Sequence, residues 1–600
     1  MSDPSAIIDF RSADEPGRLI FGEPRELFVA ETPEDVTSAL SAAENAALRG
    51  RWVVGFVAYE AAPAFDARFR VRTGCEVPLA WFAAYDQPER AAPLGRTPAF
   101  PPSGPAEIPA GWVTSEDRAT HRVAVETIRE LIAAGDVYQV NHTLRLRRAF
   151  AEDPLAFYET LASVAAAPCS AYVRLPAHHV LSVSPELFFR RTGDRITTRP
   201  MKGTAPRGRW TDEDDALGAA LGASEKDRAE NLMIVDLLRN DLGRVAEFGS
   251  VEVSDLFRVE AFPTVHQMTS TVSARCRPRT SLADVFAALF PCGSVTGAPK
   301  IAATEVIARL EDSPRQAYCG AIGLLRPGGD CAFSVAIRTA LVDQRRGEIS
   351  YGVGGGVTWA STARGEWQEA LGKAAILGEL AAADDLIETL RLEDGRPLRW
   401  ARHKARMIRS AGVLGHAANP EALDAAVREA CQATGAGSAL IRVRMAHDGR
   451  ASAAVRAFDP KVPLTAGLAA DPICSTDPRL FHKTSDRTLY ERARERLPDR
   501  GEVLLWNERG EITEFTRGNV VVELGGTLFT PPINAGLLPG VYRDELVRSG
   551  RVEERPVRVE DVAAASAIWF VNSAREWVPV GWNPRGAGGV AKTGGPAPGE

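Results

Sequence analysis

Lysine is scarce in this 600-residue sequence, where eight lysines stand beside 63 arginines (71 − 8). Arginine cannot replace lysine where chemistry needs a compact ammonium group or a nucleophilic amine. Lys202 is a candidate nucleophile because it lies in the short string Pro200–Thr204 (PMKGT), beside a glycine. Any single lysine could also be an ordinary surface residue. The eight are Lys202, Lys226, Lys300, Lys373, Lys404, Lys461, Lys483 and Lys592.

Two pairs of carboxylates are spaced for one face of a helix. Asp227 and Glu230 form one pair, and Glu366 and Glu369 form the other. Residues three apart share a helix face, and such oxygen ligands suit Mg²⁺, which takes one or two carboxylates and keeps water or substrate oxygens. The same spacing also suits two solvated helix faces. The pattern alone does not join pairs that lie so far apart in the chain.

Two strings of small residues offer backbone to a ligand. Phe290–Lys300 (FPCGSVTGAPK) leads into a helix predicted at Ile301–Leu310, so it is either an anion seat at a helix N-terminus or a simple turn. Gly352–Gly356 (GVGGG) is a second string that a ligand could approach closely.

The second half of the chain holds a separate set of strings. Lys483 lies in Phe481–Arg487 (FHKTSDR), and Ile512–Val520 (ITEFTRGNV) and Gly536–Arg543 (GLLPGVYR) follow it. Taken one at a time, these strings also fit an exposed lysine, a capped turn and a Gly-Pro loop.

Alternating short elements must position these residues. Apolar spacing predicts a helix over Arg118–Ala134, and Gly135-Asp136 ends it before a strand that begins at Val137. Further strands are predicted at Ala171–Val173, Val180–Val183, Leu187–Phe189 and Ile196–Thr198. This half is therefore predicted to be α+β, with a large and mostly antiparallel sheet system.

The stretch Gly378–Asp385 is the predicted domain boundary. Beyond it we predict a helix near 401–412 and strands at 439–445, 502–506, 519–523 and 567–571. From about Pro584 onward Gly, Pro and Ala dominate, which predicts a disordered tail over 584–600.

Composition narrows the classes of function. A net charge of −7 gives no basic footprint for nucleic acid, and no uncharged apolar run is long enough for a membrane-spanning helix. The N-terminus lacks the pattern of a signal peptide. Eight cysteines without any C-x-x-C pair fit reduced thiols, so a cytoplasmic location is expected.

Several motifs together resemble the chorismate-utilising enzymes, a family that includes anthranilate, isochorismate and aminodeoxychorismate synthases. The resemblance covers about residues 50–378, with the motifs in family order. It implies an antiparallel β-sandwich core with surrounding helices in a domain over residues 1–378. The motifs are Asp227–Arg244 (DRAENLMIVDLLRNDLGR), Phe290–Lys300, Tyr318–Gly323 (YCGAIG) and Ala336–Thr339 (AIRT).

Within this family the residue at position 202 distinguishes two kinds of synthase. Anthranilate synthases usually carry Ala there, whereas aminodeoxychorismate synthases carry Lys, as this chain does at Lys202. The resemblance implies that Lys202 attacks ring carbon 2 of chorismate and displaces the 4-hydroxyl, after which ammonia adds at carbon 4 and expels the lysine. Gln139 stands where isochorismate-type enzymes carry a water-activating Lys. Thr204, Gly354 and Gly355 would close on the substrate.

The same resemblance assigns further roles. It implies that Glu230 and Glu369 hold Mg²⁺ with Asp227 and Glu366 beside them. It also implies that Arg338 and Tyr318 hold the enolpyruvyl carboxylate and that His266 is an acid near the leaving hydroxyl; these residues all stand at the matching positions.

The strings of the second half, with His403–Arg406 (HKAR), resemble the fold-type IV pyridoxal-phosphate enzymes. The resemblance implies an α/β domain over 385–583 in which Lys483 links covalently to the cofactor and moves the proton, and Glu514 pairs with the pyridine nitrogen. Tyr542 replaces a Thr of many aminotransferases, which leaves only its backbone N–H for the phosphate. The implied cofactor contacts are Arg406, Lys483, Glu514, Leu538, Val541, Tyr542 and Ser573.

The two resemblances together imply a bifunctional enzyme that makes 4-aminobenzoate and pyruvate from chorismate and ammonia. A separate glutamine amidotransferase subunit would supply the ammonia, and a homodimer could form through the C-terminal domain. Two alternatives stay open: an aminodeoxychorismate or anthranilate synthase joined to a pyridoxal-phosphate aminotransferase, and a non-catalytic assembly subunit.

Overall fold

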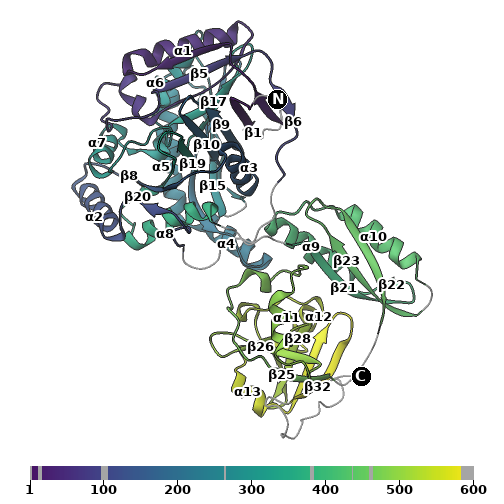
Figure 1. Cartoon of the computed structure of the whole chain (residues 1–600). Coiled ribbons are helices and arrows are strands. Elements are labelled where there is room, and N and C mark those ends of the chain that lie inside the picture. Colours follow the sequence, from purple (N-terminus) through teal and green to yellow (C-terminus); the bar gives the residue numbers. More distant parts are fainter. Residues whose placement is uncertain are drawn as a thin grey trace. The chain divides into compact units, whose positions relative to one another are not determined.

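The computed structural model describes residues 3–10, 17–95, 106–262, 265–378, 384–434, 437–458 and 464–582. The predicted disordered tail and most of the predicted boundary at Gly378–Asp385 lie outside these ranges. The described residues fall into two compact units (Figure 1). Among these residues the first unit comprises 3–10, 17–95, 106–207, 216–262 and 265–378, and the second comprises 208–215, 384–434, 437–458 and 464–582.

One antiparallel sheet of the first unit carries the strands that border the chorismate-type motifs. Its order is β16-β8-β20-β19-β10-β9-β1-β2-β6, with β7 paired to β8. These strands are β1 (Ala6–Phe10), β2 (Arg18–Phe21), β6 (Glu89–Ala91), β7 (Val113–Thr114), β8 (Gln139–Ala149), β9 (Cys169–Arg174), β10 (His178–Ser184), β16 (Gly297–Ala298), β19 (Thr339–Asp343) and β20 (Glu348–Val357).

A second antiparallel sheet carries Lys202 on its terminal strand. Its order is β13-β15-β12-β11-β18-β17-β4-β5-β3, with β14 paired to β15. These strands are β3 (Glu26–Ala30), β4 (Trp52–Val57), β5 (Ala80–Tyr85), β11 (Leu187–Thr192), β12 (Arg195–Arg199), β13 (Met201–Pro206), β14 (Glu252–Ala261), β15 (Val265–Arg275), β17 (Ala321–Leu325) and β18 (Cys331–Val335).

The two sheets share an apolar core and helices cover their other faces. Ile8 and Val173 of one sheet are buried in the same cluster as Phe56 and Leu324 of the other. Helices α3 (Pro154–Ala165) and α8 (Ala363–Ala374) pack on the first sheet, and α1 (Pro33–Leu48), α5 (Glu225–Gly243) and α6 (Leu282–Leu289) pack on the second. The prediction of an α+β fold with an antiparallel sandwich core is confirmed.

The helices predicted in this unit form where the sequence places them. Helix α2 (Arg118–Ala134) begins after Asp117, whose side chain accepts a hydrogen bond from the N–H of Thr120, and ends at Gly135 with φ 83°. Helix α7 spans Lys300–Leu310. Both acidic pairs lie on helices, one on α5 and one on α8. No described helix is long and apolar enough to span a bilayer.

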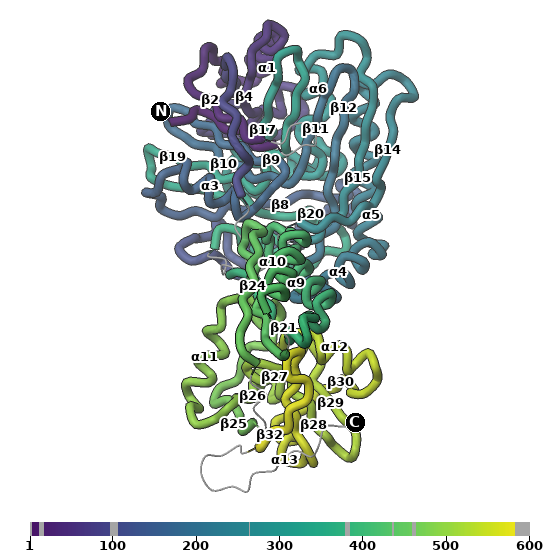
Figure 2. The backbone as a smooth tube through the Cα atoms, turned by 90° about the vertical axis from the view of Figure 1, so that its right-hand side faces the viewer, coloured from purple at the N-terminus to yellow at the C-terminus, as the bar shows by residue number. Residues whose placement is uncertain are grey.

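The second unit contains two sheets, and Figure 2 labels β21 and β24 of the smaller one. The smaller sheet has the order β22-β21-β23-β24 and is covered on one face by α9 (Trp400–Leu414) and α10 (Pro420–Gln432). Its strands are antiparallel: β21 (Leu386–Glu393), β22 (Arg396–Pro397), β23 (Ser438–Met445) and β24 (Ala451–Ala457).

The larger sheet of this unit closes on itself. It runs β27-β26-β25-β32-β31-β28-β29-β30, and an additional β27–β28 pairing closes six of these strands into a barrel around an apolar core. The predicted strands all form within these two sheets. The remaining strands are β25 (Leu464–Leu468), β26 (Glu502–Trp506), β27 (Ile512–Phe515), β28 (Gly518–Leu524), β29 (Thr527–Thr530), β30 (Glu553–Glu554), β31 (Ala567–Asn572) and β32 (Glu576–Trp582).

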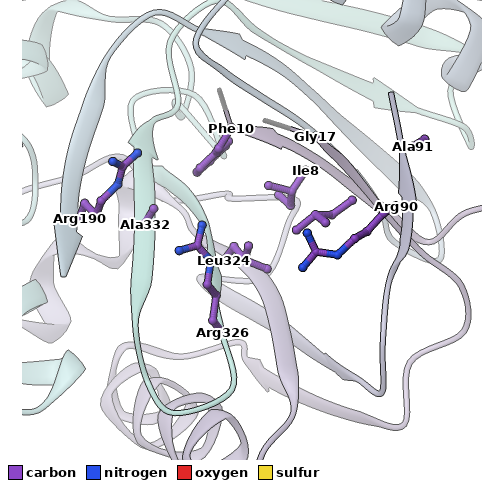
Figure 3. Close-up of a pocket in the computed structure, with 10 residues that line it drawn as sticks. Ile8, Phe10, Gly17, Arg90, Ala91, Arg190, Leu324, Arg326 and Ala332 are labelled. Carbon is purple, nitrogen blue, oxygen red and sulfur yellow. The ribbon is translucent and has the colours of Figure 1, made fainter. Parts of the chain in front are cut away.

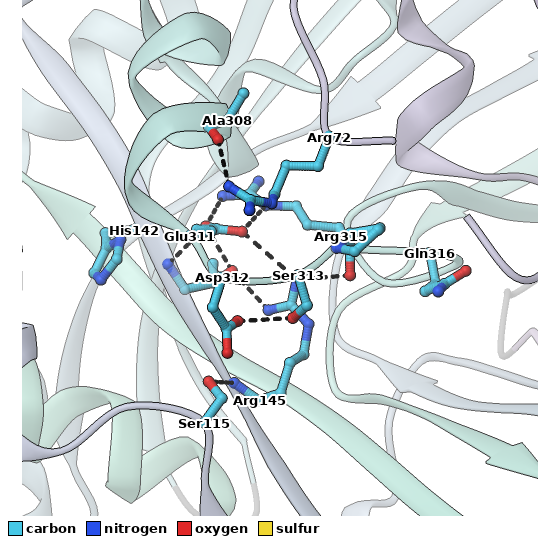
Figure 4. A network of polar contacts seen from close by, with 12 residues as sticks. Arg72, Ser115, His142, Arg145, Ala308, Glu311, Asp312, Ser313, Arg315 and Gln316 are labelled. Carbon is cyan, nitrogen blue, oxygen red and sulfur yellow. Dashed lines mark hydrogen bonds and ion pairs between the residues drawn. The ribbon is translucent and has the colours of Figure 1, made fainter. Parts of the chain in front are cut away.

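A buried ion pair joins distant segments of the first unit (Figure 4). Arg315, only 2% exposed, donates to both carboxylate oxygens of Glu311, at 3.0 and 2.5 Å. Its other N–H groups donate to the carbonyls of Val295 and Asn141, each at 2.7 Å. Glu311 also accepts the backbone N–H of Thr143 at 2.9 Å. The pair therefore ties the end of α7 to β8 and to the loop before β16.

We predict that Arg315→Met lowers the free energy of unfolding of the first unit by about 3–5 kcal/mol, because it leaves the Glu311 carboxylate buried without its cation. Urea unfolding of the full chain, followed by hydrogen–deuterium exchange of β8 peptides, measures the change. Arg239→Met is the matched control, since Arg239 pairs with Asp236 at 2.8 Å on the exposed surface, where such a pair contributes at most about 1 kcal/mol. Equal effects of the two variants would contradict the prediction.

Candidate active sites

A cavity of about 350 Å³ in the first unit gathers most of the predicted substrate and metal residues. They come from β13, α5, α8, β20 and two loops, which are far apart in sequence but adjacent in the fold. The predicted residues that line this cavity, here called the first cavity, are Lys202, Thr204, Asp227, Glu230, Tyr318, Arg338, Gly354, Glu366 and Glu369.

Two glycines of β20, Gly355 and Gly356, leave room for neighbouring side chains because they have no Cβ. A Cβ on Gly356 would collide with Nε2 of Gln139 and lie 2.7 Å from Nζ of Lys202. On the neighbouring residue, a Cβ on Gly355 would lie 2.9 Å from Oε2 of Glu366. Successive strand residues face opposite sides. The glycine run therefore leaves space for the Lys202–Gln139 pair on one side and for the carboxylates of α8 on the other.

Gln139 lies beside the first cavity with unused polar atoms. It is fully buried, and neither its amide oxygen nor its amide nitrogen has a hydrogen-bond partner among the described residues. A buried amide without a partner costs free energy unless a ligand or water satisfies it. Its place next to the amine of Lys202 makes it a candidate substrate contact.

The four carboxylates surround a region of crowded negative charge. Burial raises the pKa of Glu230, with Lys202 and Lys226 opposing the rise. Burial also raises the pKa of Glu366, and the nearby Glu369 adds to it. Oε2 of Glu366 is buried without a hydrogen-bond partner among the described residues. A cation held here would relieve both effects, so the donor set fits Mg²⁺.

Glu369 differs from Glu230 and Glu366. Lys373, at 2.8 Å, holds the pKa of Glu369 below its usual range. Lys373 also donates to the carbonyl of Gly354 at 2.7 Å, which fixes α8 to β20. In the described ranges, three carboxylate or imidazole ligand atoms lie within 4.8 Å of one another at Glu116–His121–His142 and at Glu76–His178–Asp343, but not at this cluster.

Arg338 and Tyr318 are placed to receive an anion. No carboxylate or hydrogen-bond acceptor engages the Arg338 guanidinium within the described residues, and burial lowers its pKa. Its backbone has φ 48°, in the left-handed region that an arginine rarely adopts. The ring of Tyr318 packs under the guanidinium of Arg145, 5.1 Å away. A half-buried cation without an anionic partner fits a carboxylate of the substrate.

Glu186 is a residue of the first cavity that sequence reasoning missed. It is buried just before β11 and accepts a hydrogen bond from Ser294 Oγ at 2.7 Å. Burial raises its pKa to about 7, while Lys202 opposes the rise. A carboxyl whose pKa is raised in this way can hold a proton near neutral pH. An acidic residue between two predicted apolar strands was the signal available in the sequence.

His266, the predicted acid, does not line the first cavity. Its neighbour Gln267 does, and alternation along β15 directs His266 to the opposite face. There its ring packs against Gly218 of α4 (Thr211–Ala223). The role given to His266 remains a prediction without support from its position.

A second cavity, of about 450 Å³, lies in the second unit and is lined by every predicted cofactor contact: Arg406, Lys483, Glu514, Leu538, Val541, Tyr542 and Ser573. Burial lowers the pKa of Lys483 to about 8, with Arg487 and Arg406 adding to the shift. Burial raises the pKa of Glu514 to about 7. The hydroxyl of Tyr490 donates to Glu514 at 2.8 Å and orients it.

A chain of polar contacts runs along one end of the second cavity. Arg406 donates from two nitrogens to the buried Glu388, at 2.8 and 2.7 Å. Glu388 also contacts Nδ1 of His403, whose Nε2 contacts Ser573 Oγ, each at 2.7 Å. Sequence reasoning missed Glu388, whose only signal was a charge inside a buried strand. Much of the charge of Arg406 is therefore neutralised before any ligand arrives.

The N-terminus of α12 (Val541–Arg548) lies at the same end. The first N–H groups of a helix lack partners within it, so those of Val541 and Tyr542 can bind an anion. With Lys483 and the oriented carboxylate of Glu514, these groups fit pyridoxal phosphate.

A smaller cavity, of about 110 Å³, lies between the two sheets of the first unit. Figure 3 shows the guanidinium groups of Arg90, Arg190 and Arg326 around the apolar side chains of Ile8 and Phe10. None of the predicted site residues lines it.

Comparison with known proteins defines the class of each unit. The model of the chorismate binding enzymes matches residues 5–379, and the model of amino-transferase class IV matches residues 385–581. The chain therefore belongs to the chorismate binding enzyme family, and its second unit is an amino-transferase class IV domain.

Particular relatives fit this placement. Aminodeoxychorismate synthase component 1 of Klebsiella aerogenes is 41% identical over 291 residues, which are 48% of this chain and 64% of the relative. Anthranilate synthase component 1 of Methanothermobacter marburgensis is 33% identical over 386 residues, 61% of this chain and 83% of the relative. The chain thus spans less than two thirds of the length of the first of these. Anthranilate synthase component I of Streptococcus pneumoniae shares the fold, with 24% identity, a TM-score of 0.52 and coverage of 61% and 92%.

We predict that Gly356→Ala lowers kcat of the first unit about 100-fold, because its Cβ would displace Lys202 and Gln139 and a shift of about 1 Å costs roughly that much. Steady-state kinetics with chorismate measures this. Gly372→Ala on α8 is the matched control, because its Cβ would meet nothing within 4 Å, and it should keep the wild-type rate. A Gly356→Ala enzyme of normal rate would contradict the arrangement described for β20.

We predict that the rate of cofactor attachment to Lys483 rises between pH 7 and pH 9. Only the neutral amine is nucleophilic, and a pKa of about 8 places half of the amine in that form near pH 8. Stopped-flow absorbance of apoprotein mixed with pyridoxal phosphate measures the profile. A rate that climbs only above pH 10 would mean that burial does not shift this amine.

Proposed function

We propose that this chain makes 4-aminobenzoate in two steps. The first unit converts chorismate and ammonia to 4-amino-4-deoxychorismate and water, and the second unit eliminates pyruvate from that product. The family of the first unit, the aminodeoxychorismate synthase among its relatives and the class IV domain that follows support this proposal.

The observation that carries the proposal is that, among the described residues, two lysine amines, those of Lys202 and Lys483, lack an ion-pair partner. The structure describes six of the eight lysines, and four of them form ion pairs: Lys226 with Glu230, Lys300 with Asp241, Lys373 with Glu369 and Lys404 with Asp424. In the described part of the chain, the amines of Lys202 and Lys483 have no such partner. Each of these two lines its own cavity. A half-buried amine without an ion-pair partner is suited to nucleophilic catalysis rather than to structure.

In the first unit Lys202 attacks ring carbon 2 of chorismate, and the bond from carbon 4 to its hydroxyl breaks. Glu186 donates the proton that lets this hydroxyl leave as water, since burial keeps its carboxyl partly protonated near pH 7. Ammonia then forms a bond to carbon 4 and Lys202 leaves carbon 2. The Lys202 amine must lose a proton before it attacks. The neighbouring carboxylates can accept that proton.

The remaining groups of the first cavity orient the substrate. Arg338 and Tyr318 face the enolpyruvyl carboxylate, and Gln139 and Thr204 offer polar atoms to the ring. Gly354 contributes backbone to the cavity wall, with Gly355 next to it in β20. A Mg²⁺ ion held by Glu230 and Glu369, with Asp227 and Glu366 beside them, would neutralise the ring carboxylate.

In the second unit Lys483 takes the proton from the ring carbon that bears the amine. Loss of this proton, cleavage of the ether bond and protonation of the leaving enolpyruvate give 4-aminobenzoate and pyruvate. When bound, pyridoxal phosphate supplies the electron sink that makes this C–H group acidic. Glu514 would hold a proton at the pyridine nitrogen, and Arg406, Ser573 and the N-terminus of α12 would bind the phosphate, with Leu538 against the ring.

Partners and location extend the proposal. Ammonia would come from a separate glutamine amidotransferase subunit, and the second unit would pair two copies of the chain. All eight cysteines are free, which supports a cytoplasmic location.

The test is product analysis of the purified protein supplied with chorismate, Mg²⁺, ammonium and pyridoxal phosphate. We expect 4-aminobenzoate and pyruvate in equal amounts. Lys202→Ala should abolish formation of both products, and Lys483→Ala should accumulate 4-amino-4-deoxychorismate and lose the visible absorbance band of the cofactor. Liquid chromatography with mass detection separates these compounds.

Other products would refute particular parts. Anthranilate in place of 4-aminobenzoate would overturn the role given to Lys202. A requirement for a 2-oxo acid acceptor before any second-unit turnover would make that unit an aminotransferase. Lys404→Ala is the matched control, because this lysine pairs with Asp424 at 2.7 Å and lines neither cavity, and its products should stay unchanged.

A further inference from the structure

The second cavity carries an excess of arginine on a wall that the cofactor contacts do not use. Arg442 of β23 and Arg456 of β24 line it, together with Arg487 just before α11 (Thr488–Glu495). Strand β23 pairs with both β21 and β24, with Arg442 opposite Thr389 and Leu440 opposite Arg456. Thr389, Leu440, Arg442 and Arg456 therefore share one face of the small sheet, while α9 and α10 cover the other.

These arginines lack the carboxylates that neutralise others nearby. Arg406 is held by Glu388, and Arg517 by Glu502. Among the described residues, no carboxylate lies within ion-pair distance of Arg442, Arg456 or Arg487. Arg487 instead donates to the carbonyl of Thr516 and stacks on the ring of Tyr490 at 3.9 Å.

Three carboxylates do line the second cavity, but two of them are engaged elsewhere. Glu502 pairs with Arg517 and accepts from Thr516 Oγ1 at 2.6 Å. Glu514 is held by Tyr490 and Asn519. The third, Glu491, is exposed and forms no ion pair among the described residues.

The excess of positive charge in the second cavity affects the pKa of Arg442. Partial burial lowers the pKa of Arg442, and Arg456 and Arg487 add to that shift by repulsion. Arg442 and the two cations that repel it line the same cavity as Lys483, and holding them there costs stability. Ligand anions placed between them would offset that cost.

We propose that Arg442, Arg456 and Arg487 bind the two carboxylates of the substrate in the second unit and so select dianionic substrates over amino acids with one carboxylate. The phosphate would occupy the other end of the cavity, at Arg406 and the N-terminus of α12. An apolar amino-acid side chain placed there would desolvate the half-buried Arg442 and Arg487 without supplying an anion, which is unfavourable. This inference rests on the proposed function of the second unit, whose substrate has a ring carboxylate and an enolpyruvyl carboxylate.

The test measures inhibition of pyruvate release by two unreactive probes on the full-length, cofactor-loaded protein. The probes are 3-(carboxymethoxy)benzoate, with two carboxylates, and 3-methoxybenzoate, with one. We expect the dianion to bind the wild-type protein about tenfold or more tightly than the monoanion, since a hydrogen bond to a charged group contributes at least that factor. Arg442→Gln should remove most of this preference and leave the affinity for the monoanion unchanged.

Arg444→Gln is the matched control. It lies on the same strand two residues away, is exposed, and pairs with Asp385 outside the second cavity. We expect wild-type values for both probes. If Arg442→Gln fails to fold, Arg456→Gln tests the same group from the exposed edge strand β24, and its preference should fall in the same direction.

Two results would overturn the inference. One is an unchanged preference for the dianion in Arg442→Gln and Arg456→Gln. The other is loss of the visible cofactor band in Arg442→Gln, which would assign this arginine to the phosphate. Failure of the proposed function would give a different result, because the wild-type protein would then release no pyruvate. Calorimetric titration with the two probes would still show whether the protein prefers the dianion.

Discussion

The first unit depends on one buried ion pair, that of Glu311 and Arg315. Arg315 binds the carbonyls of Val295 and Asn141, two residues that line the first cavity. The backbone N–H of Arg315 itself donates to Glu60 at 2.7 Å. An ion pair removed from water is favourable only when its remaining hydrogen-bonding capacity is satisfied. Here backbone groups satisfy it, so the pair also fixes the relative positions of three chain segments.

The paired strands β8 and β20 extend this fixed frame to the first cavity. Its register places His142 opposite Gly355 and Asn141 opposite Gly356, and it runs without interruption from Glu348 to Val357. Continuous pairing holds the backbone in place although the glycines contribute no side-chain packing. Lys202 reaches this ladder from the other sheet, and the carboxylates reach it from α5 and α8. The site therefore forms where two sheets and two helices meet, and no single segment contains it.

Much of this arrangement could be predicted from the sequence, for reasons that are local. Helix spacing predicted that Asp227 and Glu230 share a face, and the scarcity of lysine together with the family motifs indicated Lys202 and Lys483. The residues that sequence reasoning missed depend on tertiary contacts. Glu186 is significant only because the fold buries it beside Ser294.

The sequence also could not predict which way a side chain points or whether its charge is neutralised by a neighbour. Whether His266 or Gln267 faces the first cavity depends on the register of β15, which a one-residue shift would reverse. The unpaired charge of Arg442 could not be read from a chain with 71 basic residues, because neutralisation depends on neighbours in space.

The glycines of β20 also limit how this enzyme could evolve. Every single-base change at Gly355 or Gly356 that introduces a side chain would push against groups already in place on one side of the strand or the other. New chemistry is therefore more accessible through the residues that surround the ladder, such as Gln139 and Lys202, whose replacement leaves the backbone undisturbed. Descendants of this scaffold can exchange Lys202, the proposed nucleophile, while they keep the same paired backbone beside it.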